Sequence, residues 1–176
     1  MEMGTASYPT HLSEYMRACL NALADQGLGV AISVGGGIGL LHYLDYRTTH
    51  DVDAQLEPLV KLPWADVWLD SLSDLVASKM VALIERGAPR DLRDIHALCH
   101  ADLVTPERCW ALWRRRQQLA GSDTDPARAR LAIETHLARI EQHRPLAHIE
   151  DAPARAQAEQ VRTWFREAFL NVIDVD

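Results

Sequence analysis

Apolar residues recur at two different spacings along the chain. Residues 28–34 form a nearly continuous apolar run, residues 50–57 alternate apolar and polar positions, and residues 65–70 are a third short apolar segment. These patterns are typical of strands. After residue 70, apolar residues recur every three or four positions, which is the spacing of one helix face. The sequence therefore predicts an α+β protein with a small early sheet and a helical C-terminal half.

Residues that favour helix ends divide the helical segments. An amphipathic helix is expected over residues 10–26, where Gly27 ends it, and a two-turn helix over residues 38–44. Ser71 or Ser73 is expected to cap the first of five later helices, Gly87 to close it, and Thr105 to cap the third. The five expected ranges are 74–87, 89–103, 105–120, 127–143 and 151–173.

Composition and charge limit the class of protein. A chain of 176 residues with 48% hydrophobic and 24% charged residues is long enough for a folded core. No apolar run approaches the roughly 18 residues that span a bilayer, so we expect a cytoplasmic protein without a membrane partner. The formal charge of −7 disfavours general affinity for nucleic acid. The basic run Arg114–Arg116 leaves a local RNA contact open, although a solvated helix end is its more ordinary explanation.

The stretch SVGGGIGLLHYLDYRTTHDVDAQ, residues 33–55, places three consecutive glycines before an apolar segment and a D-x-D pair. A dinucleotide-binding turn would need the pattern G-x-G-x-x-G and a full crossover helix. The third glycine position is occupied by Leu40, and the intervening helix would have barely two turns. A dinucleotide-dependent oxidoreductase is therefore disfavoured.

The same stretch has features suited to nucleotidyl transfer. Side chains alternate across a strand, so Asp51 and Asp53 would share one face and could hold a divalent cation. Gly36 and Gly37 lack side chains, so their backbone N–H groups could approach a triphosphate closely. Surface strands also carry such acidic pairs without any function, so the pair alone decides nothing.

A second motif extends this pattern. The segment SLSDLVASKMVALIERGAPRDLRDIHAL, residues 71–98, places Lys79 on one expected helix and R-D-x-x-D at the start of the next. Together the two motifs resemble the nucleotidyltransferase-like AbiEii/AbiGii (MenT-type) toxin family over about residues 30–100. The residues that carry the resemblance are Gly36, Gly37, Arg47, Thr49, Asp51, Asp53, Leu75, Lys79, Ala82, Leu83, Arg86, Arg90, Asp91 and Asp94.

The resemblance implies a fold and an activity. The implied fold has a small mixed nucleotidyltransferase-type palm sheet flanked by helices in residues 1–70. A helical domain, residues 71–176, completes the active-site cleft. The implied activity is Mg²⁺-dependent transfer of a nucleotide from a nucleoside triphosphate to an RNA acceptor, in some members the tRNA 3′ end. The implied protein is a cytoplasmic toxin paired with a cognate antitoxin.

The resemblance also implies roles for individual residues. Asp51 and Asp53 would hold the metal, and Lys79 would neutralise phosphate charge. Asp94, with Asp91, would complete the catalytic set or fix Lys79 and Arg90 in place. The implied catalytic residues are thus Asp51, Asp53, Lys79 and Asp94. The implied substrate-binding residues are Gly36, Gly37, Arg47, Thr49, Lys79, Arg90 and Asp91.

One departure from the family pattern leaves an alternative open. Only 25 residues separate Asp53 from Lys79, whereas the family places more sheet there, including a strand with a third carboxylate. Asp66 and Asp70 are the candidates for that acid. The alternative is a catalytically degraded relative that serves as a nucleotide-binding or protein-interaction module.

Overall fold

The computed structural model of the chain describes residues 9–27, 33–34, 42–43, 54–55, 60–61 and 68–174. The chain divides into two compact units, Met1–Leu75 and Val76–Asp176, which we call the N-terminal unit and the helical unit. Their charge differs sharply. The helical unit has as many Asp and Glu as Lys and Arg, so the formal charge of −7 belongs entirely to residues 1–75.

The N-terminal unit contains helix α1, Glu14–Asp25, at the position that the sequence predicted. The Ser13 side chain caps it by accepting a hydrogen bond of 3.2 Å from the backbone N–H of Met16. Gly27 follows the helix with φ +68°, a conformation that glycine adopts without strain, so the expected stop is confirmed. The side chains of Met16 and Leu20 are buried.

Four short strands complete the described part of the N-terminal unit. They are β1 Ser33–Val34, β2 Ala54–Gln55, β3 Val60–Lys61 and β4 Trp68–Leu69. They pair in the order β2-β1-β4-β3, with β1 parallel to β4 and the two outer pairings antiparallel. Ser33 lies opposite Gln55 in one pairing and opposite Trp68 in the other.

The predicted fold class, α+β with a nucleotidyltransferase-type palm sheet, is wrong for the residues that the structure describes. This part of the chain is about 74% helical, and its strand pairings are confined to two-residue segments that build no palm sheet. A strand of that length can exchange very few ladder hydrogen bonds. The core is helical instead: among the described residues, the buried apolar side chains outside a helix are Pro9, Leu12, Leu69 and Val104.

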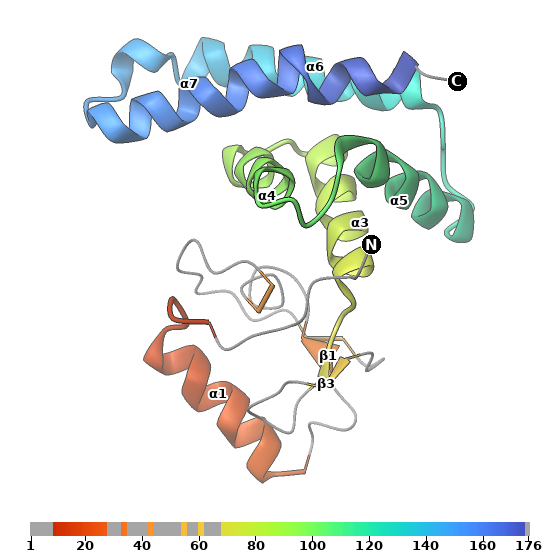
Figure 1. Ribbon diagram of the computed structural model, residues 1–176, viewed down its shortest axis with the longest axis vertical. Coiled ribbons are helices and arrows are strands. Elements are labelled where there is room, and N and C mark those ends of the chain that lie inside the picture. Colours follow the sequence, from red (N-terminus) through yellow and green to blue (C-terminus); the bar gives the residue numbers. More distant parts are fainter. Residues whose placement is uncertain are drawn as a thin grey trace. The chain divides into compact units, whose positions relative to one another are not determined.

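Helices make up most of the remaining chain (Figure 1). They are α3 Leu72–Glu85, which crosses the boundary between the units, α4 Pro89–His100, α5 Pro106–Leu119, α6 Pro126–His143 and α7 Ala152–Glu167, with 3₁₀ turns at η2 Leu146–His148 and η3 Phe169–Asp174. All five helices expected after residue 70 are confirmed, with ends displaced by a few residues. No helix in the described ranges is long and apolar enough to cross a membrane.

The helix ends follow the capping residues that the sequence offered. The Ser71 hydroxyl accepts a 3.1 Å hydrogen bond from the backbone N–H of Asp74 at the start of α3. Thr105 does the same for Arg108 at the start of α5, at 3.3 Å. Pro89 and Pro106 occupy first-turn positions, where no backbone N–H is needed. Ser71, rather than Ser73, is therefore the cap of α3.

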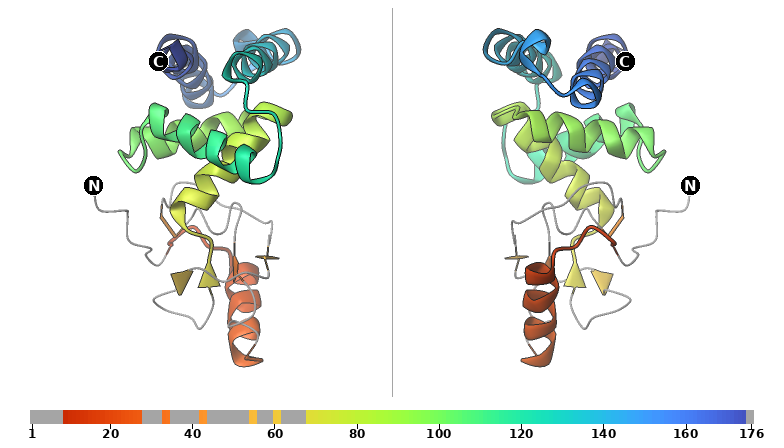
Figure 2. Two further views of the ribbon diagram at one scale, coloured as in Figure 1. Left: turned by 90° about the vertical axis from the view of Figure 1, so that its right-hand side faces the viewer. Right: turned by 90° about the vertical axis from the view of Figure 1, so that its left-hand side faces the viewer.

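Within the helical unit, α6 and α7 run in nearly the same direction and cross α4 at a steep angle (Figures 1 and 2). Aromatic rings hold this arrangement together. Phe165 and Phe169 are fully buried with ring centroids 4.9 Å apart, and Trp110 packs on Phe169 at 5.5 Å. The indole N–H of Trp110 donates to the Phe169 carbonyl at 3.3 Å. The core of the unit thus ties α5 to α7 and η3.

Candidate functional site at the turn between α3 and α4

A buried ion pair joins the middle of α3 to α4. The Lys79 ammonium donates to the Asp94 carboxylate, with 2.7 Å between Nζ and Oδ2. The Asp94 side chain is fully buried and the Lys79 side chain is 11% exposed. A buried carboxylate without an opposite charge is strongly destabilising, so each of these groups allows the other to remain charged away from water.

A tight turn brings these two residues together. Gly87, between α3 and α4, has φ +53°. A Cβ at this position would lie 2.3 Å from the imidazole ring of His136 on α6. Both the backbone conformation and the lack of space therefore require glycine here. The turn redirects the chain from α3 into α4, and Asp94 on α4 then lies beside Lys79 on α3.

Asp91 stabilises the same turn rather than joining the Lys79 pair. Its carboxylate accepts two hydrogen bonds of 2.9 Å from the Arg86 guanidinium and one of 3.1 Å from the backbone N–H of Ala88. Asp91 is in the first turn of α4, where a negative charge is favoured by the helix dipole. The Asp91 side chain is fully buried, whereas that of Arg86 is 50% exposed.

Helix α6 holds the turn from its other side. The Nε2 atom of His136 lies 3.0 Å from the carbonyl oxygen of Ile84, and the Arg139 guanidinium donates to the carbonyl oxygen of Arg86 at 2.7 Å. Arg139 also lies 3.2 Å from Nδ1 of His136. A carbonyl only accepts and a guanidinium only donates, so these contacts assign the proton of a neutral His136 to Nε2. Two carbonyl groups at the end of α3 and just after it, those of Ile84 and Arg86, thereby gain hydrogen-bond partners.

The family of the chain follows from a comparison over this region. The model of the family described as nucleotidyl transferase AbiEii toxin, type IV toxin–antitoxin system, matches residues 55–171. The chain belongs to this family. The resemblance found in the sequence is confirmed, and the match extends beyond it through α5, α6 and α7. Searches of curated proteins and of solved structures found no match.

The AbiEii match includes the second sequence motif and starts after the first. Lys79, Arg90, Asp91 and Asp94 lie inside the matched range. Arg90 is exposed in the first turn of α4. The other predicted site residues, namely Gly36, Gly37, Arg47, Thr49, Asp51 and Asp53, lie outside the described residues, as does Asp66. Asp70 is buried in the N-terminal unit.

Metal-binding side chains do not gather in the part of the chain that the structure describes. No group of three or more His, Cys, Asp or Glu residues there could hold an ion. His96 stacks on His100 with ring centroids 5.5 Å apart and meets the edge of Trp164 at 5.1 Å. Burial and the neighbouring His100 lower the pKa of His96. This pair is part of the packing between α4 and α7.

Sequence reasoning missed the partners that shape the site. It placed Arg86 in the family motif without a function and gave none to His136 or Arg139. The signal that was present is Gly87, since a glycine between two helices marks a left-handed turn and hence a close reversal. Nothing local to residues 136–139 indicates that they contact residues 84–87, because that contact depends on how α6 packs.

Proposed function

We propose that this AbiEii-family chain is a cytoplasmic toxin that transfers a nucleotide from a nucleoside triphosphate to an RNA acceptor, with Mg²⁺, and that a cognate antitoxin restrains it. Membership of the family establishes a nucleotidyltransferase-like toxin of a toxin–antitoxin system. The observation that carries the finer proposal is the ion pair between Lys79 and Asp94, because it keeps a positively charged group in a fixed position within the matched region.

Lys79 is the residue that we propose contacts phosphate. An ammonium group has three N–H donors, and the contact with Asp94 uses one of them. The Lys79 side chain is 11% exposed, so a ligand can reach it although most of the side chain is shielded from water. Phosphoryl transfer depends mainly on positioning and on stabilising charge. A lysine held in one orientation suits that task better than a mobile surface lysine.

Asp94 acts in this proposal as a positioning residue. Its carboxylate is fully buried and acts on the ligand through Lys79. The Arg86–Asp91 contact and the Gly87 turn fix the helix on which Asp94 lies. The angle between α3 and α4 therefore determines where the Lys79 ammonium lies.

The other roles rest on the sequence motifs. Asp51 and Asp53 would hold the metal, and Gly36, Gly37, Arg47, Thr49 and Arg90 would bind the substrate. When bound, Mg²⁺ would offset the negative charge of the triphosphate. Carboxylate oxygens are the ligands that this ion prefers, so the D-x-D pair has suitable chemistry.

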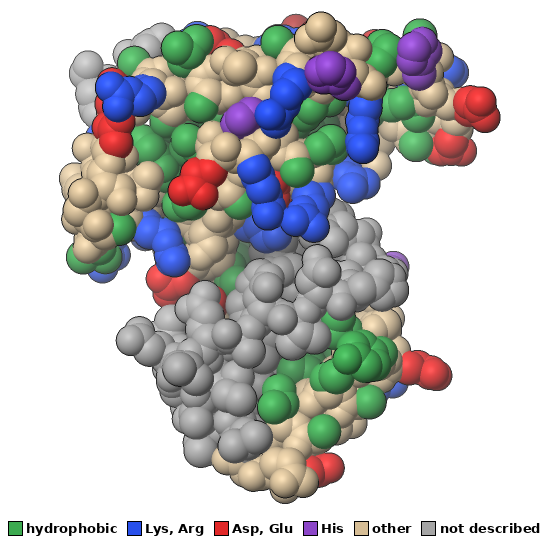
Figure 3. Space-filling view, turned by 180° about the vertical axis from the view of Figure 1, so that it is seen from behind, with side chains coloured by type: hydrophobic (Ala, Val, Ile, Leu, Met, Phe, Trp, Pro, Cys, Tyr) green, Lys and Arg blue, Asp and Glu red, His purple; other side chains and the backbone are tan. Residues whose placement is uncertain are grey.

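The charge distribution supports an RNA acceptor on the helical unit. This unit carries no net charge, although the whole chain carries −7. Its basic residues are nearly all arginines, which bind phosphate through a planar fork of donors. Lys and Arg side chains gather on the face of the unit seen in Figure 3. Such a face can meet an RNA backbone where a uniformly acidic surface would repel it.

Transfer of label from α-³²P nucleoside triphosphates to tRNA and to an unstructured transcript, with Mg²⁺, tests the proposal. Wild-type protein should label one of these RNAs. Lys79→Met should lower kcat by about a hundredfold or more, which is the effect of removing one preorganised charge at a reacting centre. Asp53→Ala should abolish transfer. Lys61→Met is the matched control, because Lys61 is the other lysine of the chain and is exposed.

Two results would overturn the proposal. Transfer by Lys79→Met at the wild-type rate would remove Lys79 from the mechanism. Absence of transfer by wild-type protein with all four nucleotides, together with calorimetric binding of one of them, would favour the degraded relative that only binds nucleotide.

A further inference from the structure

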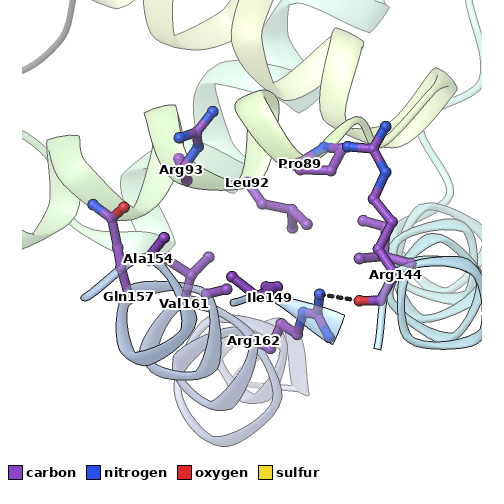
Figure 4. Close-up of a pocket in the computed structure, with 11 residues that line it drawn as sticks. Pro89, Leu92, Arg93, Arg144, Ile149, Ala154, Gln157, Val161 and Arg162 are labelled. Carbon is purple, nitrogen blue, oxygen red and sulfur yellow. Dashed lines mark hydrogen bonds between the residues drawn. The ribbon is translucent and has the colours of Figure 1, made fainter. Parts of the chain in front are cut away.

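A cavity of about 290 Å³ lies within the helical unit. It is bounded by the start of α4, the end of α6, the residues after η2 and one face of α7 (Figure 4). Its walls are mostly apolar, including the buried side chains of Leu92, Ile140 and Val161. Its size is close to the lower limit of ordinary small-molecule sites, which start at about 300 Å³.

Arg162 on α7 is a buried cation in the wall of this cavity. The residue is only 6% exposed, and its guanidinium donates one hydrogen bond of 2.8 Å, to the backbone oxygen of Arg144 (Figure 4). A guanidinium has five N–H donors, so most of its hydrogen-bonding capacity is unused by the described residues. A neutral carbonyl does not compensate its charge. Arginines are rarely buried without an anion beside them.

The lining of the cavity is basic on balance. Arg93 and Arg144 line it together with Arg162, and no Asp or Glu does. The ion pairs found among the described residues involve none of these three arginines. By contrast, Arg166, one turn further along α7, is paired with Glu141 at 2.6 Å. Arginines on α7 outside the cavity can thus have a carboxylate partner, whereas Arg162 in the cavity wall has none among the described residues.

We propose that this cavity binds a small organic anion that has one phosphate or carboxylate group on an apolar body. The Arg162 fork would hold the anionic group, since guanidinium matches the geometry of both groups with two parallel hydrogen bonds. The walls formed by Leu92, Ile140 and Val161 would cover the apolar body. The Lys79–Asp94 pair does not line the cavity, so this site is additional to the proposed transfer chemistry.

Calorimetric titration of the full chain with three matched compounds tests the proposal. These are 2-naphthyl phosphate, 2-naphthoate and the neutral 2-naphthamide, which share one apolar body. The titrations contain EDTA, so that metal-dependent nucleotide binding does not contribute. At least one anion should bind at one site per chain, and it should bind at least about tenfold more tightly than the amide. Which anion binds more tightly identifies the source as a phosphate ester or a carboxylate.

Two arginine variants assign the binding to the cavity. Arg162→Met should weaken anion binding by about tenfold or more, the effect of losing one charge-assisted contact. Arg166→Met, on the same helix but outside the cavity, should bind like wild type. If Arg162→Met does not fold, Arg162→Gln replaces it, because an amide at this position keeps an N–H donor near the Arg144 carbonyl oxygen while the charge and the planar fork are lost.

The outcomes separate this proposal from the transfer activity. Asp53→Ala should retain anion binding in EDTA even if it has lost transfer, because the residues that line the cavity belong to the helical unit and Asp53 belongs to the N-terminal unit. Equal affinity for the anions and the amide would overturn the proposal, because the arginines would then contribute nothing. Absence of binding by all three compounds, or wild-type affinity in the arginine variant that folds, would overturn it as well.

Discussion

Gly87 lies so close to the His136 ring that any larger residue at position 87 would force the backbone or the ring to move. The missing Cβ would lie 2.3 Å from the His136 ring, and the backbone of Gly87 has φ +53°. The turn between α3 and α4, the packing of α6 on that turn, and the position of Asp94 beside Lys79 therefore all depend on the absence of one methyl group.

Gly87→Ala should destabilise the protein by roughly 2–4 kcal/mol, from the left-handed backbone and the overlap with His136. Urea denaturation gives the free energy of unfolding. Gly121→Ala is the matched control, because Gly121 has φ +64° and nothing within 4 Å of the added Cβ. Gly121→Ala should lower the free energy of unfolding by only about 1–2 kcal/mol. Equal losses in the two variants would show that the His136 contact is unimportant.

Removing one partner of the buried ion pair should be worse than removing both. Lys79→Met removes the ammonium that contacts the fully buried Asp94 carboxylate, and we expect a loss of about 3–5 kcal/mol in the free energy of unfolding. Lys79→Met combined with Asp94→Leu should recover a large part of that loss, since no buried charge remains. Thermal and urea denaturation of the two single variants and the double variant check this. Additive losses would mean that the two groups do not interact.

Asp91→Ala should destabilise the helical unit by about 2–4 kcal/mol, because it removes a helix cap and the buried partner of Arg86. Arg86→Met should have at least as large an effect, because it leaves the fully buried Asp91 carboxylate without the guanidinium. The free energies of unfolding of the two variants give the comparison. A clearly smaller loss for Arg86→Met than for Asp91→Ala would contradict the importance of the Arg86–Asp91 contact.

As the pH drops below about 6.5, the free energy of unfolding should decrease in a way that depends on His96. Burial lowers the pKa of His96 from its ordinary value of 6.5, so the unfolded chain takes up a proton at a higher pH than the folded chain does. Stabilisation from neutral His96 is therefore complete above pH 6.5 and declines as the pH falls below it. The difference in unfolding free energy between wild type and His96→Leu, measured from pH 8 to pH 5, should shrink on acidification. A difference that is independent of pH would refute the assignment.

Local signals in the sequence predicted the helical half of the chain well. Ser71, Thr105, Gly27 and Gly87 each act on the backbone of their own helix end, so their effect can be recognised without knowing the fold. The strand predictions were less successful, because an alternating pattern such as residues 50–57 shows only that a segment suits a sheet. Whether it pairs, and over what length, depends on distant segments.

The candidate site was predictable only in part. The spacing of Lys79 and the R-D-x-x-D motif identified the family and named both partners of the ion pair. The partner of Asp91 was not predictable, because Arg86 meets it across a turn whose geometry depends on Gly87. The burial of Arg162 was not predictable from the sequence. Its local sequence does not distinguish it from Arg155 or Arg166 on the same helix, and it is buried only because α7 packs against α4 and α6.

Helix α6 reaches the site without contributing a side chain to the Lys79–Asp94 pair. His136 and Arg139 hold carbonyl oxygens at the end of α3, and Arg139 is exposed to solvent. If a contact on the outer surface of α6 moved Arg139 away from the Arg86 carbonyl oxygen, that hydrogen bond would be lost. The turn between α3 and α4 would then be held less firmly. The orientation of Lys79, which we propose contacts phosphate, is thus open to control from a distant surface of α6.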